Sequence, residues 1–348
     1  MILYDGIIFA LQSGGGISVL FSELLMRLDM QRRNFAMLRY DQGESPLVRH
    51  GYILRQTPRL MERYRRCDTG MLRPRLFHST YYRLPTQARY TVTTVHDFTY
   101  ERFVNGPRRL VHSWQKMAAI RNADKIICVS RSTRNDLLEY VPGISEDRIV
   151  VVPNGVAADY RVLERKTACP RDFALFVGSR GGYKNFLAAI KGVARVSGLK
   201  LVCVGGGPFT KAELGLLETY LPGRYTHAGF VSNVRLNELY NQAFCLLYPS
   251  RYEGFGIPVL EAMRAGCPVI AVATSSIPEV AGDAAVLLEE GTPEEIATAL
   301  ETLQDGSLRD RLVTAGLRQA GQFSWDRTFA ETMDVYREVL GSEVPRHF

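Results

Sequence analysis

Short apolar runs alternate along most of the chain with segments whose apolar positions recur every three or four residues. Runs of the first kind are typical of buried parallel strands, and segments of the second kind are typical of amphipathic helices. In the first half, the predicted strands are Thr91–Val95, Lys125–Val129 and Ile149–Val152, and the predicted helices are Ile17–Leu28, Pro107–Asn122 and Ser132–Tyr140. This alternation predicts an α/β fold with a parallel sheet.

The same alternation returns after residues 156–171, where the periodicity lapses. The predicted strands there are Ala174–Val177, Lys200–Val204, Phe244–Tyr248, Val269–Val272 and Ala285–Leu288. The predicted helices are Phe186–Ser197, Thr210–Thr219, Val234–Ala243, Pro258–Ala265, Pro293–Leu303 and Leu308–Gln319. We therefore predict two doubly wound, Rossmann-like domains, over residues 1–165 and 166–325, that face each other across a cleft. Ligands bind at the carboxyl ends of the strands in such folds.

The composition is that of an ordinary globular protein, with 348 residues, 46% of them hydrophobic and 23% charged. No apolar run approaches the roughly 20 residues that a membrane-spanning helix needs. The first five residues lack the basic region of a signal peptide, so we expect a cytoplasmic protein, or one peripheral at the inner face of the membrane. The six cysteines, at 67, 128, 169, 203, 245 and 267, show no C-x-x-C spacing. Since four of them adjoin apolar runs, we expect buried free thiols.

Positive charge is concentrated in the first half of the chain. Residues 1–165 hold 25 Lys and Arg against 16 Asp and Glu, or +9, and residues 166–348 hold 18 against 20, or −2, which together give the net +7. Ten of these arginines lie between Arg49 and Arg89. Such a region suits peripheral contact with an anionic membrane or a pyrophosphate-bearing acceptor, and a solvated surface is the alternative. No nucleic-acid motif accompanies the charge, so no nucleic-acid partner is expected.

The strongest candidate site is a segment in which two glutamates, Glu253 and Glu261, are eight positions apart around a predicted helix start. Pro258 suits the first turn of a helix. Gly254 and Gly256 let the backbone approach a ligand closely, and a helix N-terminus offers N–H groups to an anion. Amides for a phosphate and carboxylates for hydroxyls are what a nucleotide sugar requires. Helix-dipole stabilisation or chance also explains such a pair, if only its spacing is considered.

The residues around the pair resemble the Glu-x7-Glu signature of the retaining glycosyltransferases of family 4, which have the GT-B fold. The resemblance covers the Glu-Gly-Phe-Gly run that begins at Glu253 and the Glu-Ala-Met-x-x-Gly-x-Pro-Val run that begins at Glu261. It implies that Glu261 binds the ribose hydroxyls and Glu253 the donor sugar. It also implies a last helix, over residues 326–348, that crosses back to the N-domain. The predicted diphosphate-binding backbone is that of Gly254, Phe255, Gly256 and Ile257.

Two segments of the first half match the same family. Ser13-Gly-Gly-Gly-Ile-Ser resembles its N-terminal Gly-Gly-Ile-Ser turn, which implies that Gly15 and Gly16 contact the donor. A glycine run on its own is as typical of a plain loop. His96 and Asp97 follow a predicted strand, where the family often has His-Asp. The resemblance implies that His96 contacts the donor sugar or its leaving group. It implies also that Asp97 orients His96 or binds the acceptor.

A basic pair precedes the first helix of the second half. Arg180 and Lys184 lie between a predicted strand and a predicted helix, and two cations beside a helix N-terminus suit a diphosphate. The family commonly has its arginine five residues before the lysine, where this chain has Ser179. Lys184 therefore matches as a catalytic and donor-binding residue. Arg180, which is four residues before the lysine, departs from the family pattern.

The combined reading is a retaining hexosyltransferase that uses a nucleoside diphosphate sugar and acts in surface polysaccharide synthesis, such as that of lipopolysaccharide. GDP-mannose is the first hypothesis for the donor, and a UDP-sugar is the alternative. A saccharide or polyprenyl-linked acceptor is expected, held mainly by the N-domain. The resemblance implies no cofactor and no metal, and the chain has no D-x-D triplet. A GT-B nucleotide-sugar epimerase and an inactive binding subunit are the other readings.

Overall fold

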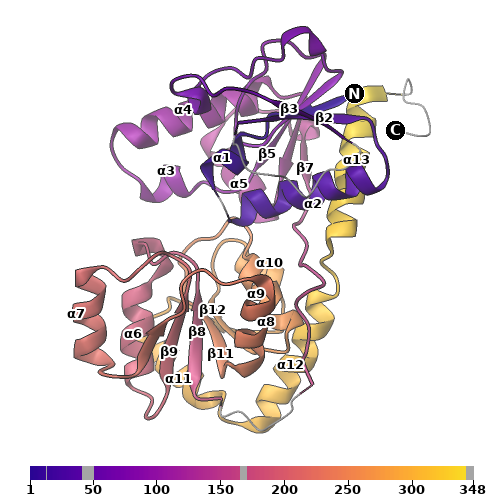
Figure 1. Ribbon diagram of the computed structural model, residues 1–348. Coiled ribbons are helices and arrows are strands. Elements are labelled where there is room, and N and C mark those ends of the chain that lie inside the picture. Colours follow the sequence, from indigo (N-terminus) through magenta and orange to yellow (C-terminus); the bar gives the residue numbers. More distant parts are fainter. Residues whose placement is uncertain (13, 41–50, 165–170, 342–348) are drawn as a thin grey trace. The chain divides into compact units, whose positions relative to one another are not determined.

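The computed structural model describes residues 1–12, 14–40, 51–164 and 171–341, and these form two compact units (Figure 1). Unit 1 comprises Met1–Gly155 and Trp325–Phe348, and unit 2 comprises Val156–Ser324. Each unit is built around one parallel sheet with helices packed on it. The predicted domain boundary at residue 165 lies outside the described residues. The described residues before it belong to unit 2, because Arg161 N and Leu163 N donate to the side chains of Asn237 and Asn241.

Unit 1 contains a seven-stranded parallel sheet in the order β3-β2-β1-β4-β5-β6-β7. Its strands are β1 (Ile2–Tyr4), β2 (Phe35–Arg39), β3 (Tyr52–Arg55), β4 (Leu76–Ser79), β5 (Tyr90–Val95), β6 (Lys125–Cys128) and β7 (Ile149–Val151). Its helices are α1 (Ile7–Leu11), α2 (Gly16–Met30), α3 (Thr99–Phe103), α4 (Pro107–Asn122), α5 (Arg131–Tyr140) and α13 (Trp325–Leu340), with short 3-10 turns η1 (Glu62–Tyr64), η2 (Gly70–Leu72) and η3 (Glu146–Arg148). The strand order reverses between β1 and β4, which is the topological switch point of this sheet.

Unit 2 contains a six-stranded parallel sheet in the order β10-β9-β8-β11-β12-β13. Its strands are β8 (Phe173–Val177), β9 (Lys200–Val204), β10 (Tyr225–His227), β11 (Cys245–Tyr248), β12 (Val269–Val272) and β13 (Val286–Leu288). Its helices are α6 (Phe186–Ala194), α7 (Lys211–Tyr220), α8 (Asn233–Gln242), α9 (Ile257–Arg264), α10 (Ile277–Ala281), α11 (Pro293–Thr302) and α12 (Gly306–Ala320), with the 3-10 turn η4 (Gly182–Lys184). Its switch point lies between β8 and β11.

The sheet of unit 2 is buried because its strands are continuous runs of aliphatic residues and cysteine. Every residue of β11 and β12 is buried, as expected of parallel strands covered on both faces. Helices α6 and α11 pack closely on this core. Their contact depends on Gly192, because a Cβ there would lie 2.4 Å from Cγ2 of Ile296. The predicted doubly wound α/β architecture is thus confirmed in both units.

Helix α13 is anchored to the sheet of unit 1 by a chain of buried hydrogen bonds. The Tyr336 hydroxyl lies 2.8 Å from that of Tyr4 and is also bonded to Nδ1 of His78. The other ring nitrogen of His78 lies 2.9 Å from Oγ1 of Thr94. Burial lowers the pKa of His78 to about 3, so the imidazole is neutral in this network. The last helix therefore completes the core of unit 1.

Two sequence-based expectations about the whole chain are tested by the described residues. Five cysteines are free and buried, namely Cys67, Cys128, Cys203, Cys245 and Cys267, and this confirms the expected burial. Cys169 lies outside the described residues. Among the residues that the structure describes, no helix has both the length and the apolar character needed to cross a membrane.

A buried ion pair joins α4 to the α3 segment. Nζ of Lys116 lies 2.7 Å from Oε2 of Glu101, and the two side chains are only 1% and 2% exposed. The hydroxyl of Ser113 donates to the other carboxylate oxygen of Glu101 at 2.7 Å. The charges are satisfied in place, so the pair is costly to break from one side only.

We expect Lys116→Met to destabilise unit 1 by about 3–5 kcal/mol, because it leaves the Glu101 carboxylate buried without its cation. Both tryptophans, Trp114 and Trp325, belong to unit 1, so tryptophan fluorescence during urea unfolding follows this unit. Arg109→Met is the matched control, since it changes an exposed cation of the same helix and should leave the midpoint unchanged. Equal midpoints for the two variants would contradict a stabilising role for the pair.

Candidate functional site

Two loops that the sequence analysis singled out separately meet at the switch point of unit 2. One follows β8 and ends at Lys184, and the other follows β11 and contains Glu253; these two strands are paired neighbours. Nζ of Lys184 lies 2.5 Å from Oε1 of Glu253, with side chains 11% and 12% exposed. The Tyr248 hydroxyl, at the end of β11, lies 3.5 Å from the same ammonium. An ion pair therefore holds the two loops together at the carboxyl ends of the strands.

The surroundings of Lys184 keep it positively charged. Burial by itself lowers the pKa of the ammonium, but the Glu253 carboxylate outweighs burial. The neighbouring hydroxyls of Tyr248 and Tyr183 also raise it. The pKa of Lys184 is consequently held above its ordinary value. The site thus contains a permanent cation in a largely buried position.

The loop after Glu253 is fixed by two serines that the sequence analysis did not place in the site. The backbone N–H of Glu253 donates to Oγ of Ser275 at 2.8 Å. The Ser276 hydroxyl donates to the carbonyl oxygens of Glu253 and Phe255, at 2.9 and 2.8 Å. Both serines immediately precede α10, and the sequence signal was a Ser-Ser pair before an Ile-Pro helix start. These bonds hold the loop rigid where it enters α9.

Gly256 forms the entry to α9, and its conformation requires glycine. Its φ of 106° lies in the left-handed region, and a Cβ there would lie 2.9 Å from Cδ1 of Ile277. Ile257 is the first helical residue, and Pro258 lies in the first turn as predicted. The side chain of Phe255 is buried in edge contact with Phe323, so only its backbone faces the loop. Gly254, Phe255, Gly256 and Ile257 therefore form one backbone segment at a helix N-terminus.

Glu261 lies on α9, beyond the first turn, between two tyrosines. The Tyr240 hydroxyl donates to Oε2 of Glu261 at 3.0 Å, and Tyr160 also hydrogen-bonds the carboxylate. The two rings are in edge contact, with centroids 6.0 Å apart. Burial raises the pKa of Glu261 to about 7, although both tyrosines work in the opposite direction. Sequence analysis found the glutamate but neither tyrosine, because both are far from it in the chain.

Arg180 does not join the Lys184–Glu253 pair. Its Nε lies 2.8 Å from Oε1 of Glu213, which is on α7. Its two terminal nitrogens donate to the carbonyl oxygens of Gly205, Gly206, Gly207 and Pro208, at 2.8–3.3 Å. The guanidinium also stacks over the ring of Phe209. Its donors are thus used to hold the glycine loop after β9, and this position does not support the predicted contact with a diphosphate.

His96 and Asp97 follow β5 in unit 1. The His96 N–H donates to the Tyr82 hydroxyl at 3.3 Å, and the Asp97 carbonyl oxygen accepts from Nζ of Lys116 at 2.8 Å. The Thr99 N–H donates to Oδ1 of Asp97 at 2.9 Å. Burial lowers the pKa of His96 to about 4, with Asp97 opposing and Lys116 adding to this effect. The imidazole is therefore neutral at physiological pH.

The ionisation of Asp97 follows from its neighbours. Burial alone raises the pKa of this carboxyl, but the Lys116 ammonium and the bonds from Thr99 outweigh burial. The pKa of Asp97 is therefore lowered, and the side chain is a carboxylate. Asp97 is thus a fixed negative group beside His96.

Gly15 and Gly16 form the beginning of α2 in the same unit. Gly16 is the first helical residue, and the carbonyl oxygen of Gly15 accepts from the Ser18 hydroxyl at 2.9 Å. Phe21, one turn further along α2, is in edge contact with the His96 ring, with centroids 6.2 Å apart. The start of α2 and the end of β5 therefore belong to one region of unit 1. Ser13, which opens the predicted turn, lies outside the described residues.

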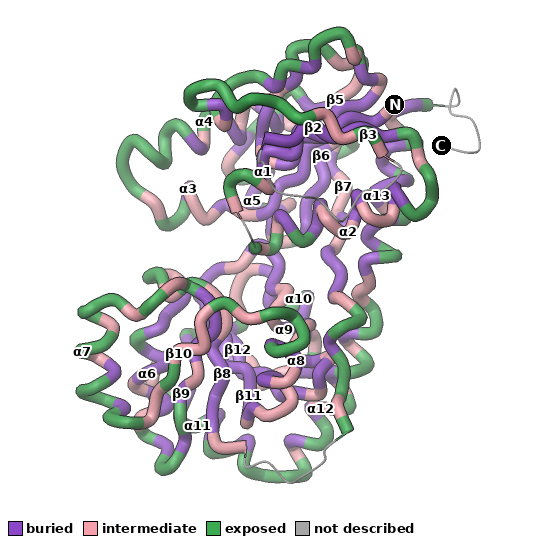
Figure 2. Tube along the Cα trace, viewed as in Figure 1, coloured by how far each residue is buried: buried purple, intermediate pink, exposed green. Residues whose placement is uncertain are grey.

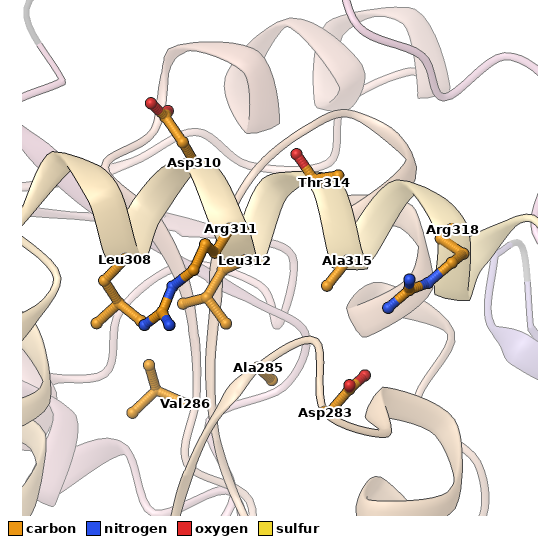
Figure 3. A pocket seen from close by; sticks show the side chains of 10 residues that line it. All are labelled: Asp283, Ala285, Val286, Leu308, Asp310, Arg311, Leu312, Thr314, Ala315 and Arg318. Atoms are coloured by element: carbon orange, nitrogen blue, oxygen red, sulfur yellow. The ribbon is translucent and has the colours of Figure 1, made fainter.

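A pocket of about 770 Å³ lies between α12 and the segment before β13 (Figure 3). Leu308, Arg311, Leu312 and Arg318 extend from α12 toward Asp283 and Val286 in the close-up. None of the predicted site residues lines this pocket. It adjoins the amino end of β13, whereas ligands of doubly wound folds bind at the carboxyl ends. We therefore place the candidate site at the Lys184–Glu253 pair.

Comparisons with known proteins agree with this placement. The family described as glycosyl transferases group 1 matches residues 165–319, and the family described as glycosyltransferase family 4 matches residues 35–160. The O-antigen chain mannosyltransferase B of Escherichia coli is 29% identical over 338 residues, which cover 85% of this chain and 86% of that protein. The serotype-specific mannosyltransferase WbdA of Escherichia coli is 27% identical over 72% of this chain, which spans about a third (34%) of its length.

Solved structures give the fold independently. A sucrose-phosphate synthase from Thermosynechococcus elongatus superposes with a TM-score of 0.79 at 18% identity, covering 97% of this chain and 98% of that one. The match extends over both units, as do the two family matches taken together. This chain therefore belongs to the group 1 glycosyltransferases of family 4 and has their GT-B fold.

Proposed function

We propose that this protein transfers a hexose, with retention of configuration, from a nucleoside diphosphate sugar to a saccharide or polyprenyl-linked acceptor. The observation that carries the proposal is the Lys184–Glu253 pair, because it joins a permanent cation to a carboxylate directly before a helix N-terminus. These are the groups that a sugar diphosphate needs at one place. Family membership supports the same reaction class.

The chemistry of transfer explains how these groups act. Negative charge develops on the departing diphosphate in the transition state, and preorganised positive groups stabilise it most effectively. Lys184 and the backbone N–H groups at the start of α9 would supply this stabilisation. Glu253 would accept hydrogen bonds from the donor sugar, and Glu261 from the ribose. We give Arg180 the role of holding the loop after β9, because its donors are engaged there.

On unit 1, we propose that His96 hydrogen-bonds the donor sugar or the leaving group through its neutral imidazole. A neutral ring both donates and accepts a hydrogen bond, whereas a protonated ring only donates. Asp97 would orient this ring or contact the acceptor, and Lys116 and Thr99 would hold its turn in place. Gly15 and Gly16, at the start of α2, remain proposed donor contacts on the basis of the family resemblance.

GDP-mannose is the donor that we propose first, because both Escherichia coli relatives described above are named as mannosyltransferases. Synthesis of an O-antigen-like surface polysaccharide follows from the same names. A thermal-shift screen against GDP-, UDP- and ADP-sugars tests the choice, since a ligand at 100 times its Kd stabilises a protein by about 2.7 kcal/mol. Stabilisation by UDP-sugars alone would favour the alternative donor.

A product assay tests the reaction itself. Separation of free nucleoside diphosphate and glycoside from an epimerised nucleotide sugar distinguishes the transferase from a GT-B epimerase. The anomeric configuration of the glycoside tests retention. Donor binding without turnover, in the presence of a competent acceptor, would favour an inactive binding subunit.

We expect Lys184→Ala to lower kcat by about 10²–10³, the usual cost of removing one preorganised donor at a developing anion. The product assay with saturating donor measures this change. Lys211→Ala is the matched control, because it removes an exposed lysine of unit 2 and should leave kcat unchanged. Wild-type turnover in Lys184→Ala would exclude the proposed role of this residue.

Donor affinity should depend on the ionisation of Glu261. The carboxyl has a pKa of about 7, so it is protonated on the acid side, where it is the poorer acceptor for ribose hydroxyls. Donor Kd should therefore decrease as pH rises through 7, when measured by calorimetry at pH values on both sides of it. Glu261→Gln should weaken binding and remove this pH dependence. A pH dependence that survives in the variant would assign it to another group.

The same carboxyl makes an opposite contribution to stability. Its pKa in the folded protein is raised above the model value of 4.5, so the folded state holds its proton more tightly than the unfolded state. This contribution is present in acid and is lost as pH rises from about 4.5 through about 7.

We also propose that no metal ion takes part, with Lys184 and the α9 amides serving the diphosphate instead. EDTA should then leave the rate of the product assay unchanged. Loss of activity with EDTA and its recovery with Mg²⁺ or Mn²⁺ would overturn this part of the mechanism.

A further inference from the structure

Unit 1 exposes a group of large apolar side chains on two neighbouring elements. On α4, Leu110 and Trp114 are each 70% exposed, and Val111 is 45% exposed. Just before η1, Leu60 and Met61 are 83% and 63% exposed. Single exposed apolar residues are normal on a protein surface, but a gathered set marks an interaction site. We call these five residues the docking face.

The two elements of the docking face lie directly against each other. The side-chain amide of Gln115, on α4, donates to the carbonyl oxygen of Arg63 in η1 at 2.7 Å. Tyr81 joins them as well, because its hydroxyl lies 3.0 Å from Nε2 of His112 and accepts from Arg63 at 3.2 Å. Figure 2 shows exposed tube along the first turns of α4. The apolar residues therefore belong to one region of the surface.

The opposite side of α4 already has its partners within unit 1. His112, Gln115, Lys116, Ala119 and Ile120 are its buried residues. Trp114 and Leu110 are thus not misplaced core residues, since the helix satisfies its core side with other positions. The solvent side of this helix is apolar as well, which a helix that only covers a core does not need.

The charge around the docking face has one sign. Helix α4 contains Arg108, Arg109, Lys116 and Arg121 and no acidic residue. Arg108 and Arg109 are exposed beside Leu110. Residues 52–75 add seven arginines, against Glu62 and Asp68 alone. Apolar side chains flanked by arginines complement a surface that is anionic outside and apolar beneath.

We propose that unit 1 docks on an anionic phospholipid bilayer through Leu60, Met61, Leu110, Val111 and Trp114, with Arg108 and Arg109 bound to lipid phosphates. Tryptophan is favoured at the membrane interface, because its ring is apolar and its N–H is polar. Arginine matches phosphate oxygens with two parallel hydrogen bonds. The docking face thus binds by apolar insertion and by charge, rather than by charge alone. Arg49, where the sequence-based basic region begins, lies outside the described residues.

The same features disfavour a second copy of the chain as the occupant. A symmetric dimer places the same patch on both sides of its interface. Arg108 and Arg109 would then face their own counterparts, with no acidic residue on α4 to pair with them. The anionic bilayer offers the opposite charge.

Trp114 provides a direct test. In the full chain carrying Trp325→Phe, it is the sole tryptophan, and Trp325 is itself buried in α13. Adding vesicles of phosphatidylcholine and phosphatidylglycerol should shift its emission to the blue and protect it from acrylamide. Vesicles of phosphatidylcholine alone should have a much smaller effect. The Trp114→Phe chain, which keeps Trp325, should show no shift.

Co-sedimentation with the same vesicles separates insertion from charge. Leu110→Ser with Val111→Ser should weaken partitioning by about tenfold, the effect of losing two apolar side chains. Arg108→Glu with Arg109→Glu should weaken it and reduce its salt dependence. Val234→Ser, at an exposed apolar position of unit 2, is the matched control and should bind as the unchanged chain does. Circular dichroism of each variant checks its fold.

Three outcomes would overturn the proposal. They are an unchanged Trp114 emission with excess anionic vesicles, wild-type partitioning of the Leu110→Ser and Val111→Ser chain, and a lipid-free dimer that buries Trp114 in sedimentation experiments. No nucleotide sugar is present in these measurements, so their failure is separate from a failure of the proposed transferase activity.

Discussion

The candidate site depends on the ion pair between Lys184 and Glu253. Removing two charges from water is unfavourable, and their attraction compensates only when the geometry is good and the remaining polar atoms are satisfied. The fold meets this condition by placing the pair at the ends of two adjacent parallel strands, with Tyr248 beside the ammonium. Ser275 and Ser276 fix the backbone on the carboxylate side. The loop that presents the α9 amides is rigid for the same reason.

Local patterns were sufficient for the elements that are long or continuously apolar. The strands of unit 2 that the sequence revealed are runs of four or five residues, whereas β1 and β10 have only three each and were missed. The edge strand β3 is only partly buried, so it lacks an apolar run. Lys184 and Glu253 were identified from motifs. Their contact across 69 residues could not be read from local spacing, since it requires the pairing of β8 with β11.

The electrostatics of the site depend on tertiary burial, which a motif does not contain. His96 is neutral because it is buried, and Glu261 titrates near neutrality because α9 places it between Tyr160 and Tyr240. Arg180 shows the limit of sequence spacing most clearly. It lies four residues before Lys184, yet its guanidinium is directed to the loop after β9 and to Glu213. Neighbours in the chain therefore serve different parts of the unit.

The anchoring of α13 has a consequence for the synthesis of this chain on the ribosome. All residues of unit 2, Val156–Ser324, are made before Trp325, so its core can assemble while unit 1 still lacks its last helix. Until that helix is made, the hydroxyl of Tyr4 and the ring of His78 are without their Tyr336 partner. The domain whose sheet is translated first is therefore the last to be completed. A ribosome that stops shortly after residue 324 would release a folded second domain joined to an unfinished first one.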